Sequence, residues 1–118
     1  MSLDSNKACE RDELFDDATG DLAVGDLASA VEKYRQCVEI DPEFFDGWHA
    51  LGLALMKNGD LKPAIGAALQ STTLQPNDQL AWTALSQMYV ADGNIAEAET
   101  AKQNATILGI GGKVVRDQ

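Results

Sequence analysis

Residues 45–78 read FDGWHALGLALMKNGDLKPAIGAALQSTTLQPND, and this stretch of 34 residues decides the fold. One of its glycines and its tryptophan recur 34 residues away in the chain. Three glycines mark the period: Gly25, Gly59 and Gly93. Trp48 and Trp82 are also 34 residues apart. A period of this length is typical of supersecondary units that stack into a continuous array.

Each unit is predicted to hold two helices. In the middle unit the first helix should run from Asp46 to about Asn58, with an apolar stripe at helical spacing: Trp48, Leu51, Gly52 and Leu55. Gly59 would end it, and Asp60 would cap a second helix from Leu61 to Gln75. Pro63 fits only the first turn of that helix. In the third unit Asn94 and Glu97 predict a capping box.

These residues resemble the tetratricopeptide repeat family. The middle unit shows W-x-x-L-G-x-x-L from Trp48, and the third shows W-x-x-L-S-x-x-Y from Trp82. The resemblance implies an all-α solenoid with a right-handed superhelical path. It predicts one domain over 11–112, an N-terminal extension at 1–10 that could be disordered, and a tail at 113–118. The three repeats would span 11–44, 45–78 and 79–112.

The first and last units depart from the pattern. Asp17 and Asp21 stand where the family is normally apolar, and burying two unpaired carboxylates would be costly. The first helix must therefore be rotated, shifted by one residue or exposed on that side, and we expect a one-residue shift toward the alternative stripe of Phe15, Ala18 and Leu22. The last helix is polar at Glu99, Lys102 and Gln103. Polar ends are typical of terminal units, so we expect a complete short array.

In the middle unit, Gly66 stands in the centre of the second helix, where glycine costs about 1 kcal/mol relative to alanine. We expect tight packing inside the array to explain it. Close approach of a partner backbone is the alternative.

The resemblance also implies a concave groove lined by the first helix of each pair. The groove positions map to Asp12, Phe15, Thr19, Leu22 and Ala23, then Asp46, His49, Leu53, Met56 and Lys57, then Leu80, Thr83, Gln87, Val90 and Ala91. Four of them are apolar in the middle of the wall: Leu53, Met56, Leu80 and Val90. One interpretation is a binding site for an apolar or amphipathic segment. The other is that the chain's own tail or a second copy fills the groove.

Family members that grip a chaperone's C-terminal carboxylate use lysine, asparagine and arginine in this groove. The corresponding positions in this chain hold Phe15, Thr19, Ala50, Leu80 and Ala84. None of these side chains can clamp a carboxylate, which argues against a chaperone-tail co-adaptor.

Charge and composition exclude other classes. The formal net charge is −10, which argues against nucleic acid and anionic membranes as partners. Residues 1–46 carry −9 of it, either as a solvated face or as an acidic patch for a basic partner. Two cysteines, Cys9 and Cys37, are too few for a disulfide framework or a zinc site, so we expect a reducing cytoplasm. No catalytic set, metal site or cofactor motif emerges, and we expect no enzyme.

We therefore expect a cytoplasmic, non-catalytic adaptor that binds a partner protein segment in its groove. The alternatives are a self-associating scaffold, with the groove or the middle repeat as a homo-oligomer interface, and a secretion-type chaperone.

Overall fold

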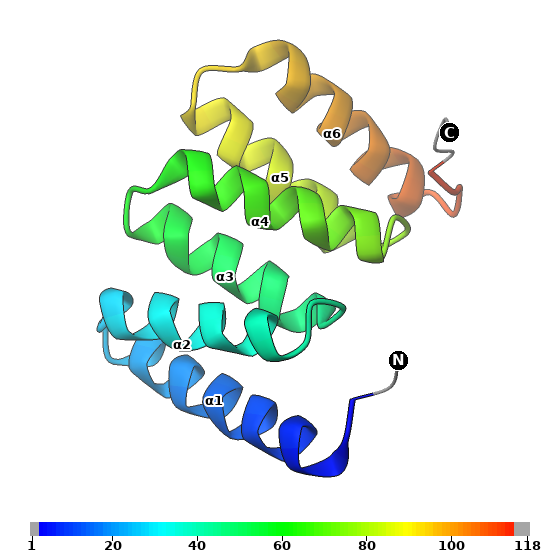
Figure 1. Cartoon of the computed structure of the whole chain (residues 1–118). Coiled ribbons are helices and arrows are strands. Elements are labelled where there is room, and N and C mark those ends of the chain that lie inside the picture. The colour runs from blue at the N-terminus through cyan, green and yellow to red at the C-terminus, as the bar shows by residue number, and fades with distance from the viewer. Residues whose placement is uncertain (1–2, 115–118) are drawn as a thin grey trace.

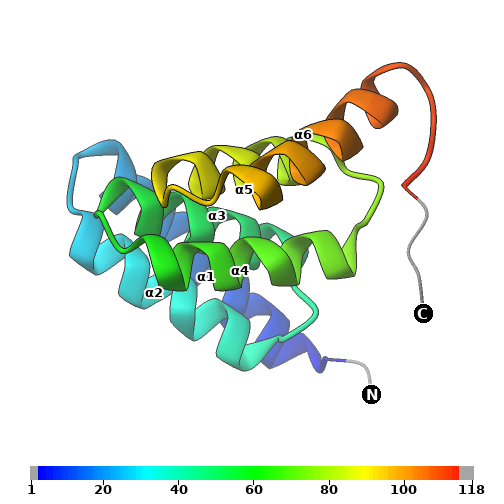
Figure 2. The same cartoon turned by 90° about the horizontal axis from the view of Figure 1, so that it is seen from above.

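The computed structural model describes residues 3–114, and this part of the chain folds into six helices without strands. They are α1 (Ser5–Ala23), α2 (Leu27–Ile40), α3 (Phe45–Lys57), α4 (Leu61–Leu74), α5 (Gln79–Ala91) and α6 (Ile95–Gly109). The helices pair as α1 with α2, α3 with α4 and α5 with α6, and the pairs stack in chain order (Figure 1). Seen from above, α2 and α4 lie to one side of α1 and α3 (Figure 2). The predicted all-α solenoid is confirmed.

The turn inside each pair is the same three times over. Gly25, Gly59 and Gly93 have φ of 84°, 88° and 81°, the left-handed conformation that glycine adopts without strain. After each glycine the next backbone N–H reaches back to close the helix end. Asp60 N donates to Leu55 O at 2.9 Å, and Asn94 N donates to Tyr89 O at 2.9 Å. This pattern is a helix stop of the Schellman type.

Side-chain caps form at some of the helices, but at neither of the two where they were predicted. Asp26 accepts a hydrogen bond from Ser29 N at 3.3 Å, and Asp78 accepts one from Ala81 N at 3.0 Å. Asp60 and Asn94 occupy N-cap positions, but neither side chain makes a cap hydrogen bond. The capping box at Asn94 and the cap at Asp60 were therefore wrong in detail. Asp60 Oδ2 instead accepts a hydrogen bond from Asn58 Nδ2 at 2.9 Å.

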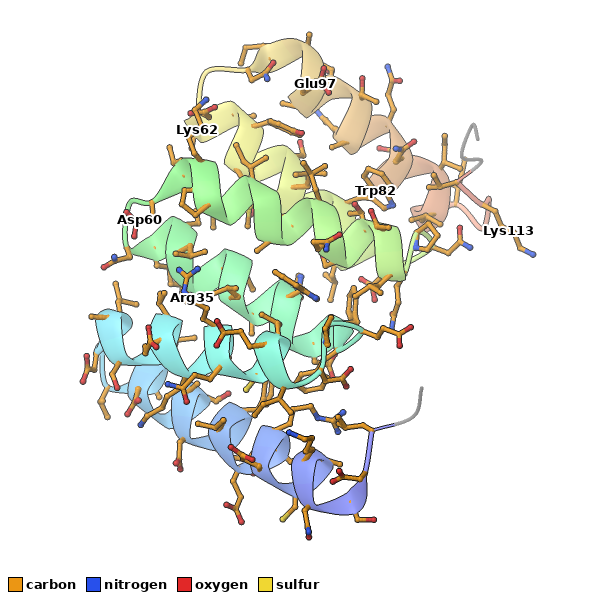
Figure 3. The ribbon with its side chains drawn as sticks, in the orientation of Figure 1. Arg35, Asp60, Lys62, Trp82, Glu97 and Lys113 are labelled. Atoms are coloured by element: carbon orange, nitrogen blue, oxygen red, sulfur yellow. The ribbon has the colours of Figure 1, made fainter. Side chains whose placement is uncertain are left out.

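Two tryptophans brace the joints between successive pairs. Trp48 Nε1 donates to Pro42 O at 2.8 Å, and Trp82 Nε1 donates to Pro76 O at 2.7 Å. Each indole thus bonds the loop before its own helix, and Figure 3 shows Trp82 near the loop between α4 and α5. The same hydrogen bond from a tryptophan to a proline carbonyl thus forms at both joints between pairs.

Of two glycines inside the helices of the middle unit, only Gly52 lies where two helices approach closely. A Cβ at Gly52 would lie 3.3 Å from Ala64 O and 3.5 Å from Ala68 N, so α3 and α4 approach backbone to backbone. Ser86 holds the same position in the third unit and donates to Ala98 O at 3.0 Å. Gly66 is exposed, and a Cβ there would meet nothing within 4 Å. The expectation of tight packing at Gly66 was wrong.

The first helix keeps the 34-residue register. Asp26 N donates to Asp21 O at 2.9 Å, the same bond that closes the other two units, so the expected one-residue shift was wrong. Ala18 is buried at the position of Gly52, whereas Asp17 is exposed. Asp21 is tolerated because Lys33 Nζ lies 2.8 Å from its carboxylate. The carboxylates need no shift, because α1 has no described helix on its outer side.

The two ends of the array differ from the predicted domain bounds. α1 begins at Ser5, so most of the extension placed at 1–10 is helical. Past α6, Val114 N donates to Asn77 Oδ1 at 3.1 Å. Of the predicted tail at 113–118, residues 115–118 lie outside the described residues. No helix in the described range is both long and apolar enough to cross a membrane.

Candidate functional site

A cleft of about 320 Å³ opens between the first helices of the second and third units. Its lining comes from α3 and α5 alone: His49, Leu53, Leu80, Thr83, Ala84 and Gln87. Five of these six are predicted groove residues. The period explains the arrangement, because positions 49 and 83, and positions 53 and 87, are equivalent in the repeat. The structure therefore brings the middle of the predicted site together in one cleft.

The cleft joins an apolar floor to polar groups at its rim. Ala84 is buried, Leu53 is half-buried, and Leu80 is 71% exposed. The His49 ring stacks on Phe45 with centroids 5.8 Å apart and planes 7° apart, which fixes its orientation. The Gln87 amide has no hydrogen-bond partner among residues 3–114. An apolar side chain could enter this cleft while His49 and Gln87 bond polar groups beside it.

Three further predicted residues extend the same wall toward the helix C-termini. Met56 is half-buried and packs against the core, Lys57 is exposed, and Val90 is 57% exposed. Each lies three or four residues after a lining residue, and residues at that spacing share a helix face. Leu80 and Val90 together leave large apolar side chains in contact with solvent.

The first unit is closed by its own side chains. Phe15 packs against Tyr34 and Phe44, with both ring centroids 5.4 Å away. Thr19 Oγ1 lies 2.9 Å from Tyr34 Oη, and Leu22 packs on the core. These predicted groove residues are thus engaged in internal contacts, and the open part of the wall begins at α3.

A cation also packs over the Phe44 ring. The Arg11 guanidinium lies 4.4 Å from the Phe44 ring centroid and bonds Asp41 Oδ2 at 2.7 Å. This contact fixes the loop between α2 and α3 against α1. The α1 end of the wall is therefore rigid and filled.

A second hollow of about 360 Å³ lies on α6 alone. Its lining is Glu99, Lys102, Gln103, Thr106 and Ile107, all on the exposed side of that helix. No second described helix forms a wall of this hollow. The cleft between α3 and α5 is the better site, because two rigid helices define its shape.

Both thiols of the chain have a pKa above the ordinary value. Burial raises the pKa of the Cys37 thiol to about 11, so it stays protonated at neutral pH. Glu13 raises the pKa of the exposed Cys9 thiol through its negative charge. Within residues 3–114 no group of three histidine, cysteine or acidic side chains is placed to hold a metal ion. The chemistry that the cleft offers is shape, apolar surface and hydrogen bonding.

The sequence analysis missed one residue of this site and left another out of the predicted groove contacts. Ala84 lines the cleft, although the sequence analysis named it only as a groove position that cannot clamp a carboxylate. Phe45 orients His49, but Gln79 stands at its equivalent position, so the period gave no hint of a ring there.

Comparison with known proteins agrees with the fold. The family model described as "Tetratricopeptide repeat" matches residues 49–111, and another described as "TPR repeat" matches residues 22–59. A TPR repeat-containing protein of Pseudomonas aeruginosa is 44% identical over 45 residues, which are 38% of this chain and 43% of that protein.

Two solved structures superpose over most of the chain. One is the second TPR of Spaghetti bound to an HSP90 peptide, SRMEEVD, with a TM-score of 0.82 and 18% identity over 87% of this chain and 94% of that one. The other is the type III secretion translocator chaperone SycD of Yersinia enterocolitica in an alternative dimer. Its TM-score is 0.83, with 16% identity over 94% of this chain and 82% of that one. At these identities the likeness concerns the fold.

Proposed function

The chain belongs to the tetratricopeptide repeat family, and from that premise we propose that it is a non-catalytic protein-interaction module whose concave wall binds a segment of a partner protein. The observation that carries the proposal is the cleft between α3 and α5, with Leu80 exposed at its rim. The partner segment would be apolar or amphipathic. We place the protein in the reducing cytoplasm, in keeping with its two free thiols.

The physical basis is burial of apolar surface on a preformed wall. Leu53 and Leu80 line the cleft, and Met56 and Val90 continue it. Full burial of such a side chain is worth about 1.5–3 kcal/mol, less the cost of ordering the ligand. Both helices are fixed by their pairs, so binding needs little rearrangement of the protein.

The solved relatives support both this function and its alternatives. The Spaghetti domain was solved with a bound peptide, which is the mode we propose for this chain. SycD is named as a secretion chaperone and was solved as a dimer, the basis for keeping a secretion-type chaperone and a self-associating scaffold as second candidates. A second copy on the concave wall would bring another charge of −10 against it, so we favour the partner segment.

The test uses peptides selected from a random displayed library on the full chain. Changing Leu53 and Met56 to serine should abolish binding of the selected peptides, because the floor of the wall becomes polar. Far-ultraviolet circular dichroism should show unchanged helicity. The matched control is Leu69→Ser, which makes the same chemical change at an exposed position on α4.

Absolute mass by light scattering accompanies this test. A mass near 12.6 kDa at all concentrations means that no second copy of the chain covers the cleft. A stable dimer, or binding that is unaffected by the Leu53 and Met56 changes, would contradict the proposal.

A further inference from the structure

The three helices of the concave wall carry very unequal charge. α1 contains six acidic and two basic side chains, α3 contains one of each, and α5 contains none. The two cations of α1 do not offset its acids toward a ligand, since Lys7 lies in its first turn and Arg11 is bonded to Asp12 and Asp41. Even after Asp12 pairs with Arg11 and Asp21 with Lys33, α1 remains the acidic end of the array, whereas α5 carries no charge.

One carboxylate of this wall lies beside the cleft. Asp46 precedes His49 by three residues on α3, a spacing that puts Cβ atoms about 5–6 Å apart on one face. It is also the repeat equivalent of Leu80, which lines the cleft itself. Asp46 is exposed and has no ion-pair partner among residues 3–114.

Acidic side chains continue from Asp46 toward α1. Asp16 is the repeat equivalent of Ala50 and of the cleft residue Ala84, and it too is exposed without an ion pair in the described part of the chain. Lys57 is the cation of α3 and lies at the opposite end of that helix from Asp46. A ligand that crosses the wall from the cleft toward α1 thus meets apolar surface first and carboxylates next.

On the premise of the proposed function, we propose that the occupant is a basic amphipathic segment of a partner protein. It places one apolar side chain in the cleft between α3 and α5 and a lysine or arginine against Asp46. The net charge of −10 favours such a segment over an acidic one and over a second copy of the chain. The peptide bound by the Spaghetti domain, SRMEEVD, is acidic. The ligand that we propose for this chain is therefore opposite in charge to the one in that structure.

The experiment begins with the same random displayed library, selected on the full chain at low salt. We expect the enriched peptides to share an apolar residue flanked by lysine or arginine. One of them, synthesised with a fluorescent label, is then titrated with two variants of equal net charge. Asp46→Asn should weaken binding about two- to fivefold at low salt, and the difference should shrink as salt rises. Glu32→Gln, on the exposed side of α2, should change binding little.

The results of this experiment distinguish a failure of the basic-segment proposal from a failure of the proposed protein-binding function. Enriched peptides that are acidic, or equal effects of Asp46→Asn and Glu32→Gln, would overturn the basic segment while binding still depended on Leu53. Peptides whose binding ignores Leu53→Ser would overturn the proposed function itself. A dimer interface that covers the cleft would overturn both.

Discussion

At the scale of single residues, the two central glycines of the middle repeat have opposite roles. Gly52 lets α3 lie against α4, since a Cβ there would be 3.3 Å from both Ala64 O and Met88 Cε. Gly66 has open space around it and brings only the conformational freedom of glycine to the middle of α4. The amino-acid type alone could not distinguish them, because the difference lies in what surrounds each one.

We expect alanine at these two positions to change stability in opposite directions. Gly66→Ala should raise the free energy of unfolding by about 0.4–1 kcal/mol, because alanine favours the helix and meets no neighbour. Gly52→Ala should lower it by about 1–3 kcal/mol through overpacking against Ala64 and Met88. Urea denaturation of both variants beside the parent chain measures the difference. A destabilised Gly66→Ala would mean that its surface is covered in the folded protein.

At the scale of the helix pairs, the sequence determines most of what is observed. In the middle unit, the glycine turn and the apolar spacing predict helices over 46–58 and 61–75, within one residue of α3 and α4. The first pair was harder to predict, because its fit depends on tertiary contacts. Asp21 is acceptable only because Lys33 and Ser29 lie opposite it on α2. The sequence of α1 alone does not indicate that Lys33 and Ser29 would lie beside Asp21.

The ion pair between α1 and α2 gives the first pair a pH-dependent stability. The hydrogen bond from Lys33, and then that from Ser29, hold the pKa of Asp21 below its ordinary value. Because the folded pKa is lowered, the contribution is present above the unfolded pKa of about 3.9 and is lost as pH falls through the folded value. Asp21→Asn should therefore flatten the acid side of the stability profile. Urea midpoints across a pH series measure this.

Glu10→Gln is the control for this prediction. Glu10 lies on the same helix, is exposed, and has no ion pair within residues 3–114. Its replacement should leave the shape of the profile unchanged. If Asp21→Asn and the parent chain lose stability in parallel as the pH falls, the pair between Asp21 and Lys33 does not stabilise the fold.

At the scale of the whole molecule, an asymmetry of the array positions the site. The α1 end is filled by Phe15 and Phe44, and residues 1–46 carry −9 of the net charge of −10, whereas the wall between α3 and α5 is open and apolar. The period predicted which positions share the wall. It could not predict that the first unit closes on itself, because that depends on Phe44 in a loop.

A charged side chain on the second helix of the middle pair links that pair to the next one. Lys62 on α4 reaches the turn between α5 and α6, where its Nζ lies 2.7 Å from Asp92 Oδ2 (Figure 3). This exposed pair links successive units and contributes little to stability on its own. The array is thus held by its pairs and joints, which leaves the concave side chains of α3 and α5 free for a partner.

The most direct test of this account is to map where a ligand binds by nuclear magnetic resonance. A peptide selected on the full chain would be titrated into the isotope-labelled protein, and amide shifts would be followed residue by residue. We predict that the largest changes cluster around His49, Leu53, Thr83 and Gln87, with little change along the exposed side of α6. Shifts concentrated at Lys102, Gln103 and Thr106 would place binding at the other hollow and contradict the central claim.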